Sequence, residues 1–477
     1  MPWCPNCKTE YQDGYTVCSD CGSTLVESLE QAAAEEAAEY IRDAAASFPD
    51  DTGFETEEIQ EAQEETLPEG KELLHDKTHH GVYEGASDKA ENFKSGAYTL
   101  LTAGIVGLAI FGRTEDTVTD KKLISSLQGL RAVAFLSVVL SHCGAPWLGP
   151  WAISVFVALS GFLMTCNYYD RPRTAPGLRS AITFSLQKIR KLYPLHLIMM
   201  VAALLLVLKG LLAQPSARGV LSCAAQLVVS IFLLQTWIPS SRFWFCLNGV
   251  AWYLSVQAFL YAIFPWLLAV LKKADTRRLR CIAAAIFCAQ FLFSLAILKA
   301  GLSGKAAFYL TYLCPLFRAG DFAISCCMGC LYRSHKEEPT LRGVFSLLEL
   351  TAVLFSGGCF FIAARQVDVL GTVAFRYNVL FTPSAVLLVW LLAVGKGVIS
   401  RLLSAKPFLW LAGLSPYGFL IHQVLIRYME LAANKLGLTA HPVVWTLTVF
   451  LLTLCLSSFY KALERRMRKR HAKAAAR

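Results

Sequence analysis

The sequence predicts an all-α polytopic membrane bundle of about ten transmembrane helices. Of its 477 residues, 55% are hydrophobic and only 17% are charged, and the mean hydropathy is +0.45. Apolar stretches of about 17 to 25 residues, the length that crosses a bilayer as a helix, recur between positions 127 and 460. Helices satisfy their backbone hydrogen bonds within one segment, so they are the expected spanning elements. This composition excludes an ordinary soluble domain as the main part of the chain.

Residues 1–26 contain two Cys-x-x-Cys pairs, formed by Cys4, Cys7, Cys18 and Cys21. Four thiolates at this spacing can surround one zinc ion, which predicts a structural zinc ribbon; a redox dithiol pair is the alternative. A closed four-thiolate shell leaves no open coordination position, so no catalysis is expected there. The module resembles the short zinc ribbons at the start of many bacterial membrane proteins.

Residues 27–96 form an acidic linker that we expect to be partly helical. Positions 27–70 hold fifteen Asp and Glu residues and one Arg, a net charge of −14, which is typical of a solvated segment. The apolar segment 97–112 is short for a full crossing. We expect it to lie in the membrane interface, because a crossing would expose the zinc ribbon outside the cell, where thiols oxidise. The ribbon is therefore predicted to be cytoplasmic.

Four basic regions interrupt or follow the predicted membrane domain, residues 120–466. They are 170–191, 272–280, 333–342 and 465–477. Positive charge beside membrane segments favours the cytoplasmic side, which also places the C-terminal tail, 467–477, in the cytoplasm of a multi-pass protein of the cell membrane. Nucleic-acid binding is the less favoured explanation, so the expected partner is membrane lipid.

Same-side basic regions require even numbers of crossings between them. Most intervals contain an even number of apolar segments, but the interval between 191 and 272 contains three: 192–213, 220–238 and 250–271. One of these three is therefore expected to be a partial or re-entrant helix.

Arg131 and His142 are costly residues within the first apolar segment, 127–145. Eleven residues of helix end about 20° past three turns and span about 16.5 Å, so the two side chains share one face. If Arg131 begins the helix at the cytoplasmic surface, His142 lies near the middle of the membrane, where an ionisable group is a candidate functional residue. Alternatively, Arg131 extends to the headgroups and His142 caps the far helix end.

Later motifs point to a known family. They are the segments WAISVFVALSGFLM, SLQKIRKLYPLH, NGVAWYLSVQAFLYAIFP, CPLFRAGDF, LAGLSPYGFLIHQVL and SSFYKALERRMRKR. Together with the first helix, over residues 125–466, they resemble the acyltransferase-3 family of integral-membrane O-acyltransferases. The resemblance implies transfer of an acyl group, usually acetyl, from cytoplasmic acyl-CoA to a hydroxyl of an envelope glycan, a lipid-linked sugar or a similar acceptor.

The resemblance also implies roles for the residues of the first helix. The family's arginine and histidine, with ten residues between them, match Arg131 and His142. His142 is then the catalytic base or acyl-transfer residue, because neutral imidazole can take up a hydroxyl proton and release it near neutral pH.

The donor site implied by the resemblance is basic. A family Arg-x-x-Arg pattern before Tyr-Pro corresponds to Lys188 and Lys191, with Arg190 between them and Tyr193 following. Phosphates of acetyl-CoA need positive charge, which lysine supplies without the bidentate geometry of arginine. The alternative is a positively charged cytoplasmic loop with no ligand.

The remaining candidate residues support the site or the substrate. Ser160 lies in a Ser-Gly-Phe step that allows close helix contact. Trp252 and Ser255 match a family motif whose glutamate is replaced by Gln257, which can hydrogen-bond but carries no charge. Trp252 and Tyr417 are candidates for stabilising the developing oxyanion.

Three further elements resemble family motifs in the second half of the domain. Arg318 and Asp321 lie three residues apart and are expected to form a structural ion pair. His422 is a candidate for acceptor binding or for buried packing. Glu464 matches a closing glutamate, for which an ion pair with Arg465 or Arg466 is the alternative.

Two other classes of protein stay open on the sequence. A transporter or exporter of a small polar solute could use the same buried groups, and Gln257 favours it. A catalytically silent scaffold could use the zinc ribbon for interaction, although this leaves His142 without a role. Nothing in the sequence indicates an oligomeric state.

Overall fold

The computed structural model describes residues 124–475 apart from 171–176, 214, 335–341 and 368. Several predictions lie outside the described residues: the zinc ligands Cys4, Cys7, Cys18 and Cys21, the linker 27–96 and the apolar segment 97–112. They stay predictions.

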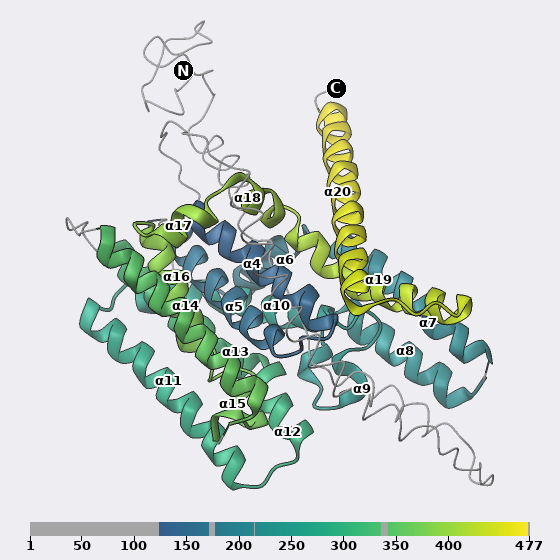
Figure 1. Ribbon diagram of the computed structural model, residues 1–477, viewed down its shortest axis with the longest axis horizontal. Helices are drawn as coiled ribbons and strands as arrows, with labels where there is room; N and C mark the ends of the chain where they lie inside the picture. The colour runs from purple at the N-terminus through teal and green to yellow at the C-terminus, as the bar shows by residue number, and fades with distance from the viewer. Residues whose placement is uncertain (1–123, 171–176, 214, 335–341, 368, 476–477) are drawn as a thin grey trace, which may run out of the picture. The chain divides into compact units, whose positions relative to one another are not determined.

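Helices make up all the regular structure in the described part of the chain (Figure 1). The long helices are α4 (Ser125–His142), α5 (Leu148–Tyr168), α6 (Leu178–Ile189), α7 (Tyr193–Ala213), α8 (Ala217–Ile231), α10 (Ala251–Leu271), α11 (Thr276–Lys299), α13 (Pro315–Ser334), α14 (Arg342–Arg365), α16 (Thr382–Val394), α19 (Ser415–Leu436) and α20 (Pro442–Ala475). The short elements are η1 (Gln235–Trp237), α9 (Ser241–Trp244), α12 (Gly304–Phe308), the π-helix η2 (Tyr309–Leu313), η3 (Val369–Gly371), α15 (Val373–Arg376), α17 (Val398–Leu403) and α18 (Lys406–Ala412).

Seven described helical segments are long and apolar enough to cross a membrane, and eight if α18 and α19, which meet at a bend of 61°, form one span. The seven are α5, α7, α10, α11, α12 continued into α13, α14 and α20. This confirms a polytopic helical bundle, whereas the total of ten stays a prediction. Three helices account for the shortfall. Helix α4 carries Gln128, Arg131 and several serines, so it is less apolar than a typical spanning helix. Helices α8 and α16 have 15 and 13 residues, fewer than the roughly 17 needed to span.

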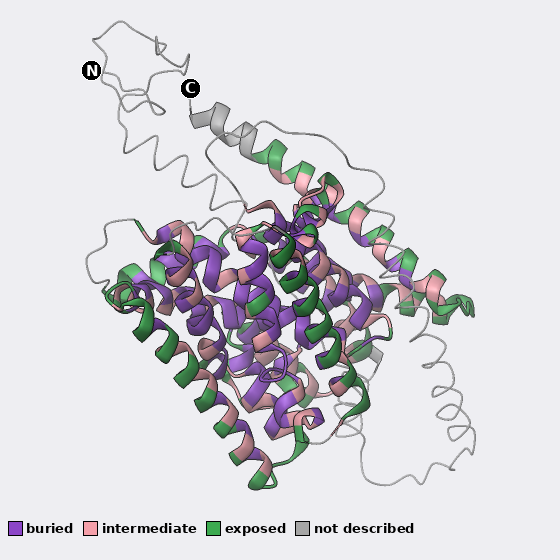
Figure 2. Cartoon of the chain, turned by 60° about the vertical axis from the view of Figure 1, so that its left-hand side comes forward, coloured by how far each residue is buried: buried purple, intermediate pink, exposed green. Residues whose placement is uncertain are grey.

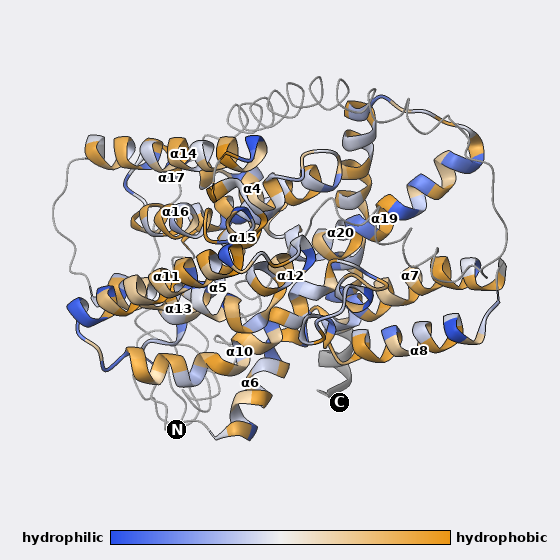
Figure 3. Ribbon diagram, turned by 90° about the horizontal axis from the view of Figure 1, so that it is seen from below, coloured by the Kyte–Doolittle hydropathy of each residue, from blue (hydrophilic) through white to orange (hydrophobic). Residues whose placement is uncertain are grey.

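Helices α4 and α5 form the centre of the bundle. Helix α5 packs against α4, α13 and α16, and α10 packs against α6 and α13. Figure 1 shows α11 and α14 along one side and α7 and α8 on the opposite side. Buried residues concentrate in the central helices (Figure 2), and apolar residues continue onto the outer ones (Figure 3). Exposed leucines and valines on α7, α14 and α20 are the expected lipid-facing surface of a membrane bundle.

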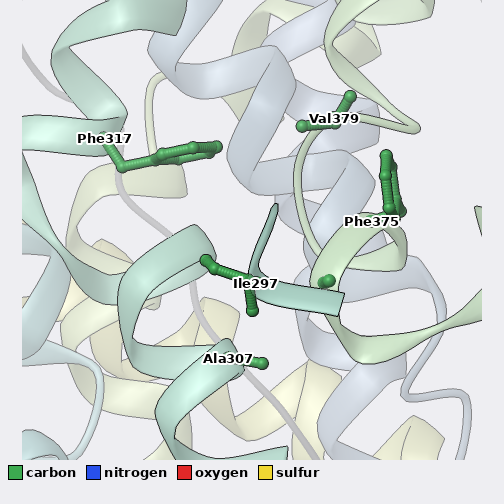
Figure 4. Close-up of a cluster of buried hydrophobic side chains, with 6 residues drawn as sticks. Ile297, Ala307, Phe317, Phe375 and Val379 are labelled. Atoms are coloured by element: carbon green, nitrogen blue, oxygen red, sulfur yellow. The ribbon is translucent and has the colours of Figure 1, made fainter. Parts of the chain in front are cut away.

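A hydrophobic cluster joins the ends of α11, α12 and α13 to α15 (Figure 4). Its buried members are Ile297, Ala307, Phe317, Ala374, Phe375 and Val379. Burial of these side chains holds the short helices α12 and α15 against the longer ones, since neither is long enough to be stable alone.

Close contact between α5 and α13 depends on Gly161. A Cβ atom at this position would lie 2.7 Å from the backbone oxygen of Phe322 and 2.9 Å from the Cβ of Ser325. Such distances are too short for real atoms, so only glycine allows this approach. The predicted role of the Ser-Gly-Phe step in close helix packing is confirmed.

Three of the basic regions meet at one end of the bundle. Arg333 forms an ion pair with Asp170, and the Lys272 ammonium lies 5.2 Å from the centroid of the Tyr169 ring. From this end, α6 returns along α10, where the Ser185 hydroxyl donates to the Ala258 carbonyl at 2.6 Å. Helix α6 therefore carries the following basic residues back toward the bundle.

The interval between 191 and 272 forms α7, the short helix α8, an irregular connection (residues 232–250) and α10. The 15-residue α8 matches the prediction of one partial helix here. Leu233 and Leu247 in this connection adopt positive φ angles of 55° and 60°, a conformation that L-residues rarely take. The connection is anchored to α19, because Val250 donates its N–H to the side-chain oxygen of Gln423 at 3.0 Å and Arg427 donates to the Leu247 carbonyl at 2.6 Å.

Candidate active site

His142, the last residue of α4, packs against His422 of α19. The ring centroids lie 4.7 Å apart and the ring planes are inclined at 74°, an edge-to-face contact. His422 is fully buried and His142 is half-buried. His142 does end its helix, as one interpretation of the sequence predicted, but its ring faces a neighbouring helix of the bundle.

Hydrogen bonds define the tautomer of the neutral His422 ring. Its Nδ1 atom lies 3.1 Å from the Gly418 carbonyl oxygen and 2.6 Å from that of Phe419. A carbonyl only accepts, so Nδ1 carries the proton and Nε2 of the neutral ring is an acceptor. This Nε2 atom is buried and has no hydrogen-bond partner among the described residues. An acceptor nitrogen thus lies beside His142 in the interior of the bundle.

Glu430 and Cys143 also border this histidine pair. Glu430 interacts electrostatically with His142 and Arg427; it was absent from the predicted site, although the one acidic residue of α19 was a signal. The Cys143 thiol, next to His142, interacts with Glu430 and hydrogen-bonds Thr446.

Arg131 lies inside the bundle and not at its surface. Helix α4 begins at Ser125, six residues earlier, and Arg131 is 2% exposed. Its Nη1 donates to the side-chain oxygen of Gln128 at 2.9 Å, and the Tyr261 hydroxyl interacts with it. The expectation that Arg131 begins the helix is wrong. About 16.5 Å of helix separates it from His142, so the two residues occupy different parts of the bundle.

Gln257 joins α10 to α5 through hydroxyl groups near Arg131. Its Nε2 donates to the Tyr253 hydroxyl at 2.5 Å and to the Ser160 hydroxyl at 3.2 Å. Ser160 also hydrogen-bonds Tyr261, which interacts with Arg131. The structure therefore brings Ser160, Gln257 and Arg131 into one buried network.

Trp252 and Ser255 point elsewhere. The Trp252 ring packs at 5.1 Å against that of Tyr312, and the Ser255 hydroxyl lies 2.8 Å from that of Thr236. Both are fully buried. These contacts connect α10 to η2 and to the irregular connection and do not place either residue beside the histidine pair.

Arg318 and Asp321 form the predicted ion pair, with Nη1 and Oδ2 3.0 Å apart. Arg318 also donates to the Tyr312 carbonyl at 2.8 Å and to the Asn378 side-chain oxygen at 2.6 Å. The second Asp321 oxygen accepts hydrogen bonds from Gln290, Asn378 and Thr382. This buried network links α11, α13 and the start of α16, which supports the structural interpretation of the pair.

The four predicted donor residues differ in their surroundings. Lys188 is 7% exposed, with its ammonium 4.7 Å from the centroid of the Tyr168 ring. The Tyr193 hydroxyl donates to the Ile231 carbonyl at 2.8 Å. Arg190 is exposed, and the Lys191 ammonium lies over an aromatic ring of α19. Arg190 and Lys191 are therefore the better candidates for contact with a soluble anion.

The ring beneath Lys191 belongs to Tyr417, at 5.8 Å. The Tyr417 hydroxyl donates to Glu464 at 2.6 Å, so α19, α20 and the end of α6 meet here. Along α19, Tyr417 and His422 are five residues or about 7.5 Å apart. One helix thus connects the basic segment to the histidine pair.

Comparison with known proteins agrees with this arrangement. A family model described as an acyltransferase domain matches residues 124–461. Acyltransferase MdmB of Streptomyces mycarofaciens is 31% identical over 191 residues, which are 36% of this chain and 47% of that protein. Peptidoglycan O-acetyltransferase OatA of Listeria monocytogenes is 22% identical over 331 residues, 64% of this chain and 50% of that protein.

The chain thus spans about half the length of these curated relatives, and no solved structure matches it. The family model, in contrast, covers most of the chain and nearly all of the described helices. On that match, the chain belongs to the acyltransferase-3 family.

Proposed function

We propose that this protein is a membrane O-acyltransferase that moves an acyl group, preferably acetyl, from acyl-CoA to a hydroxyl of an envelope glycan, a lipid-linked sugar or a similar acceptor. The observation that carries the proposal is the contact of His142 with His422 within the bundle. Membership of the family and the name of OatA as a peptidoglycan O-acetyltransferase support it.

The reaction needs a base at the acceptor hydroxyl. The hydroxyl oxygen attacks the thioester carbonyl, a C–O bond forms, the C–S bond breaks, and the hydroxyl proton passes through an imidazole to the coenzyme A thiolate. His142 is the proposed base, because it is half-buried and therefore accessible to substrate. Packing around the rings would limit hydrolysis of the thioester by water.

The proposed donor site lies where α6 meets α19. Arg190 and Lys191 supply positive charge for the phosphates of acetyl-CoA, with Lys188 behind them. From Tyr417, next to Lys191, α19 leads to His422. We assign this side of the bundle and the C-terminal tail to the cytoplasm, where acyl-CoA is made, because basic regions gather here.

A structural zinc ion bound by Cys4, Cys7, Cys18 and Cys21 is a separate part of the proposal. It rests on the cysteine spacing alone. The purified full chain should contain one zinc per molecule, and replacement of Cys4 and Cys7 by serine should abolish it. Zinc content that survives this double substitution would contradict the assignment.

A transporter of a small polar solute is the second candidate. The irregular connection, with positive φ angles at Leu233 and Leu247, favours it, because broken segments line many transport pathways. Uptake of a labelled disaccharide into proteoliposomes without consumption of acetyl-CoA would identify this activity.

The decisive experiment follows labelled acetyl groups. Purified full-length protein in detergent is given radiolabelled acetyl-CoA and the disaccharide of N-acetylglucosamine and N-acetylmuramic acid. We expect O-acetylated disaccharide from the wild type and a loss of about a hundredfold or more in His142→Ala. Cys143→Ala is the neighbouring control and should keep its activity. Equal rates for wild type and His142→Ala would overturn the proposal.

A further inference from the structure

His422 and Asn248 share an unusual property: each holds a buried hydrogen-bond acceptor atom without a partner in the part of the chain that the structure describes. The atoms are His422 Nε2 and Asn248 Oδ1. The two side chains are 0% and 2% exposed. Buried polar atoms are nearly always paired, by protein, water or ligand, because an unpaired one costs free energy.

The orientation of the Asn248 amide follows from its partner. Its Nδ2 donates to the Leu420 carbonyl at 3.1 Å. A carbonyl only accepts, so this contact identifies the amino group, and the remaining atom must be the acceptor Oδ1. The same reasoning identifies Nε2 of His422 as an acceptor. Both unpaired atoms therefore require a hydrogen-bond donor.

The two residues lie at one region of α19, although Asn248 itself belongs to the connection before α10. Leu420, which holds Asn248, precedes His422 by two residues on this helix. His142 approaches the same turn from α4. Asn248 also lies three residues before α10, whose 21 residues span about 31 Å to its end next to Lys272. Asn248 therefore lies at the opposite end of α10 from Lys272, whereas Leu420 is three residues along α19 from Tyr417, which lies beneath Lys191, so both acceptor and donor molecules have to be tested as partners of these atoms.

We propose that His422 Nε2 and Asn248 Oδ1 accept hydrogen bonds from hydroxyl groups of the acyl acceptor, which selects a polyhydroxylated molecule such as a sugar. The inference rests on the proposed function for the identity of this ligand as the acceptor. A molecule with several hydroxyls can satisfy both atoms while one hydroxyl remains beside His142. The amide N–H groups of the pantetheine arm of acyl-CoA offer the same chemistry, so the experiment separates the two sources.

The test measures binding without acyl transfer. Full-length protein in detergent is titrated with the N-acetylglucosamine and N-acetylmuramic acid disaccharide, with its O-methylated derivative, which has no hydroxyl donors, and with coenzyme A. His422→Leu and Asn248→Leu remove the acceptors, and His422→Gln restores an acceptor oxygen. Gln423→Leu is the matched control, because it loosens the Val250 anchor of the same connection without removing either atom.

We expect His422→Leu and Asn248→Leu each to weaken disaccharide binding about three- to tenfold, the effect of one lost hydrogen bond. His422→Gln and Gln423→Leu should stay within about twofold of the wild type, as should coenzyme A binding in all variants. The O-methylated disaccharide should bind poorly to every protein.

Three results would overturn the inference: no binding of the disaccharide to the wild type, equal disaccharide binding in all variants, or weakened binding of coenzyme A in place of the disaccharide. The second would assign the two atoms to ordered water, and the third to the donor. Because no acetyl-CoA is present, these results do not depend on catalysis. A protein that binds the disaccharide as expected but transfers no acetyl group would contradict the proposed function and leave this binding site standing.

Discussion

His142 and His422 contact each other edge to face, although they come from the first and the second-last described helices of the domain. Two imidazoles at 4.7 Å disfavour simultaneous protonation, since like charges repel. The pair therefore acts as one unit that holds at most one extra proton, and the effects of substituting its members should not add.

A double-mutant cycle tests this unit. We expect His142→Ala to lower the transfer rate about a hundredfold or more, and His422→Leu alone to lower it by more than the roughly three- to tenfold due to weaker acceptor binding. In the double variant, His422→Leu should cost only that roughly three- to tenfold relative to His142→Ala, because residues of one catalytic unit are non-additive. The measurement is kcat/KM for the disaccharide. Losses that multiply would show that the two histidines act independently.

The ion pair of Arg318 and Asp321 leads to a second prediction, which concerns stability. Removal of one member of a buried ion pair leaves an uncompensated charge, so Arg318→Met and Asp321→Leu should each destabilise the fold by about 3–5 kcal/mol. The double variant should recover part of this loss, since no buried charge remains. Thermal unfolding in detergent measures all three. A double variant less stable than both single ones would contradict the interpretation of the pair as a structural contact.

Gly161 provides a prediction about helix packing. Alanine here requires α5 and α13 to separate, so Gly161→Ala should destabilise the fold by about 1–3 kcal/mol. Gly357 of α14 is the matched control, because a Cβ atom there meets nothing within 4 Å. Gly357→Ala should be neutral or stabilising, given the low helix propensity of glycine. Similar melting temperatures for both variants would mean that the α5–α13 approach adjusts without cost.

The fold was largely predictable because hydropathy and segment length determine where membrane helices form. Local spacing was equally informative for Arg318 and Asp321, since residues three apart in a helix are neighbours. Helix starts were not predictable to the same degree. Ile124, before α4, provides no side-chain cap hydrogen bond, so no capping side chain marks the start of the helix six residues before Arg131.

The neighbours of the candidate site depend on tertiary packing. Glu430 interacts with His142 because α18 and α19 meet at 61° and α19 then packs along α4. No local pattern encodes that angle. Gln257 shows the same limit: the sequence indicated a missing carboxylate, but only the packing of α10 against α5 shows that its amide bonds Ser160 and Tyr253.

Substitution of Arg190 and Lys191 tests the proposed donor site. Exposed or partly exposed cations at this end should contribute to binding of the coenzyme A phosphates. Arg190→Gln and Lys191→Gln should therefore each raise KM for acetyl-CoA several-fold. They should change kcat little, because remote phosphate contacts are the same in the ground and transition states. High salt should reduce the difference between variants and wild type by screening. Lys299→Gln, at the C-terminal end of α11, is the matched control and should behave as wild type. A fall in kcat with unchanged KM would instead assign these residues to the chemical step. A rise in KM of the same size in Lys299→Gln would show that net charge alone is responsible.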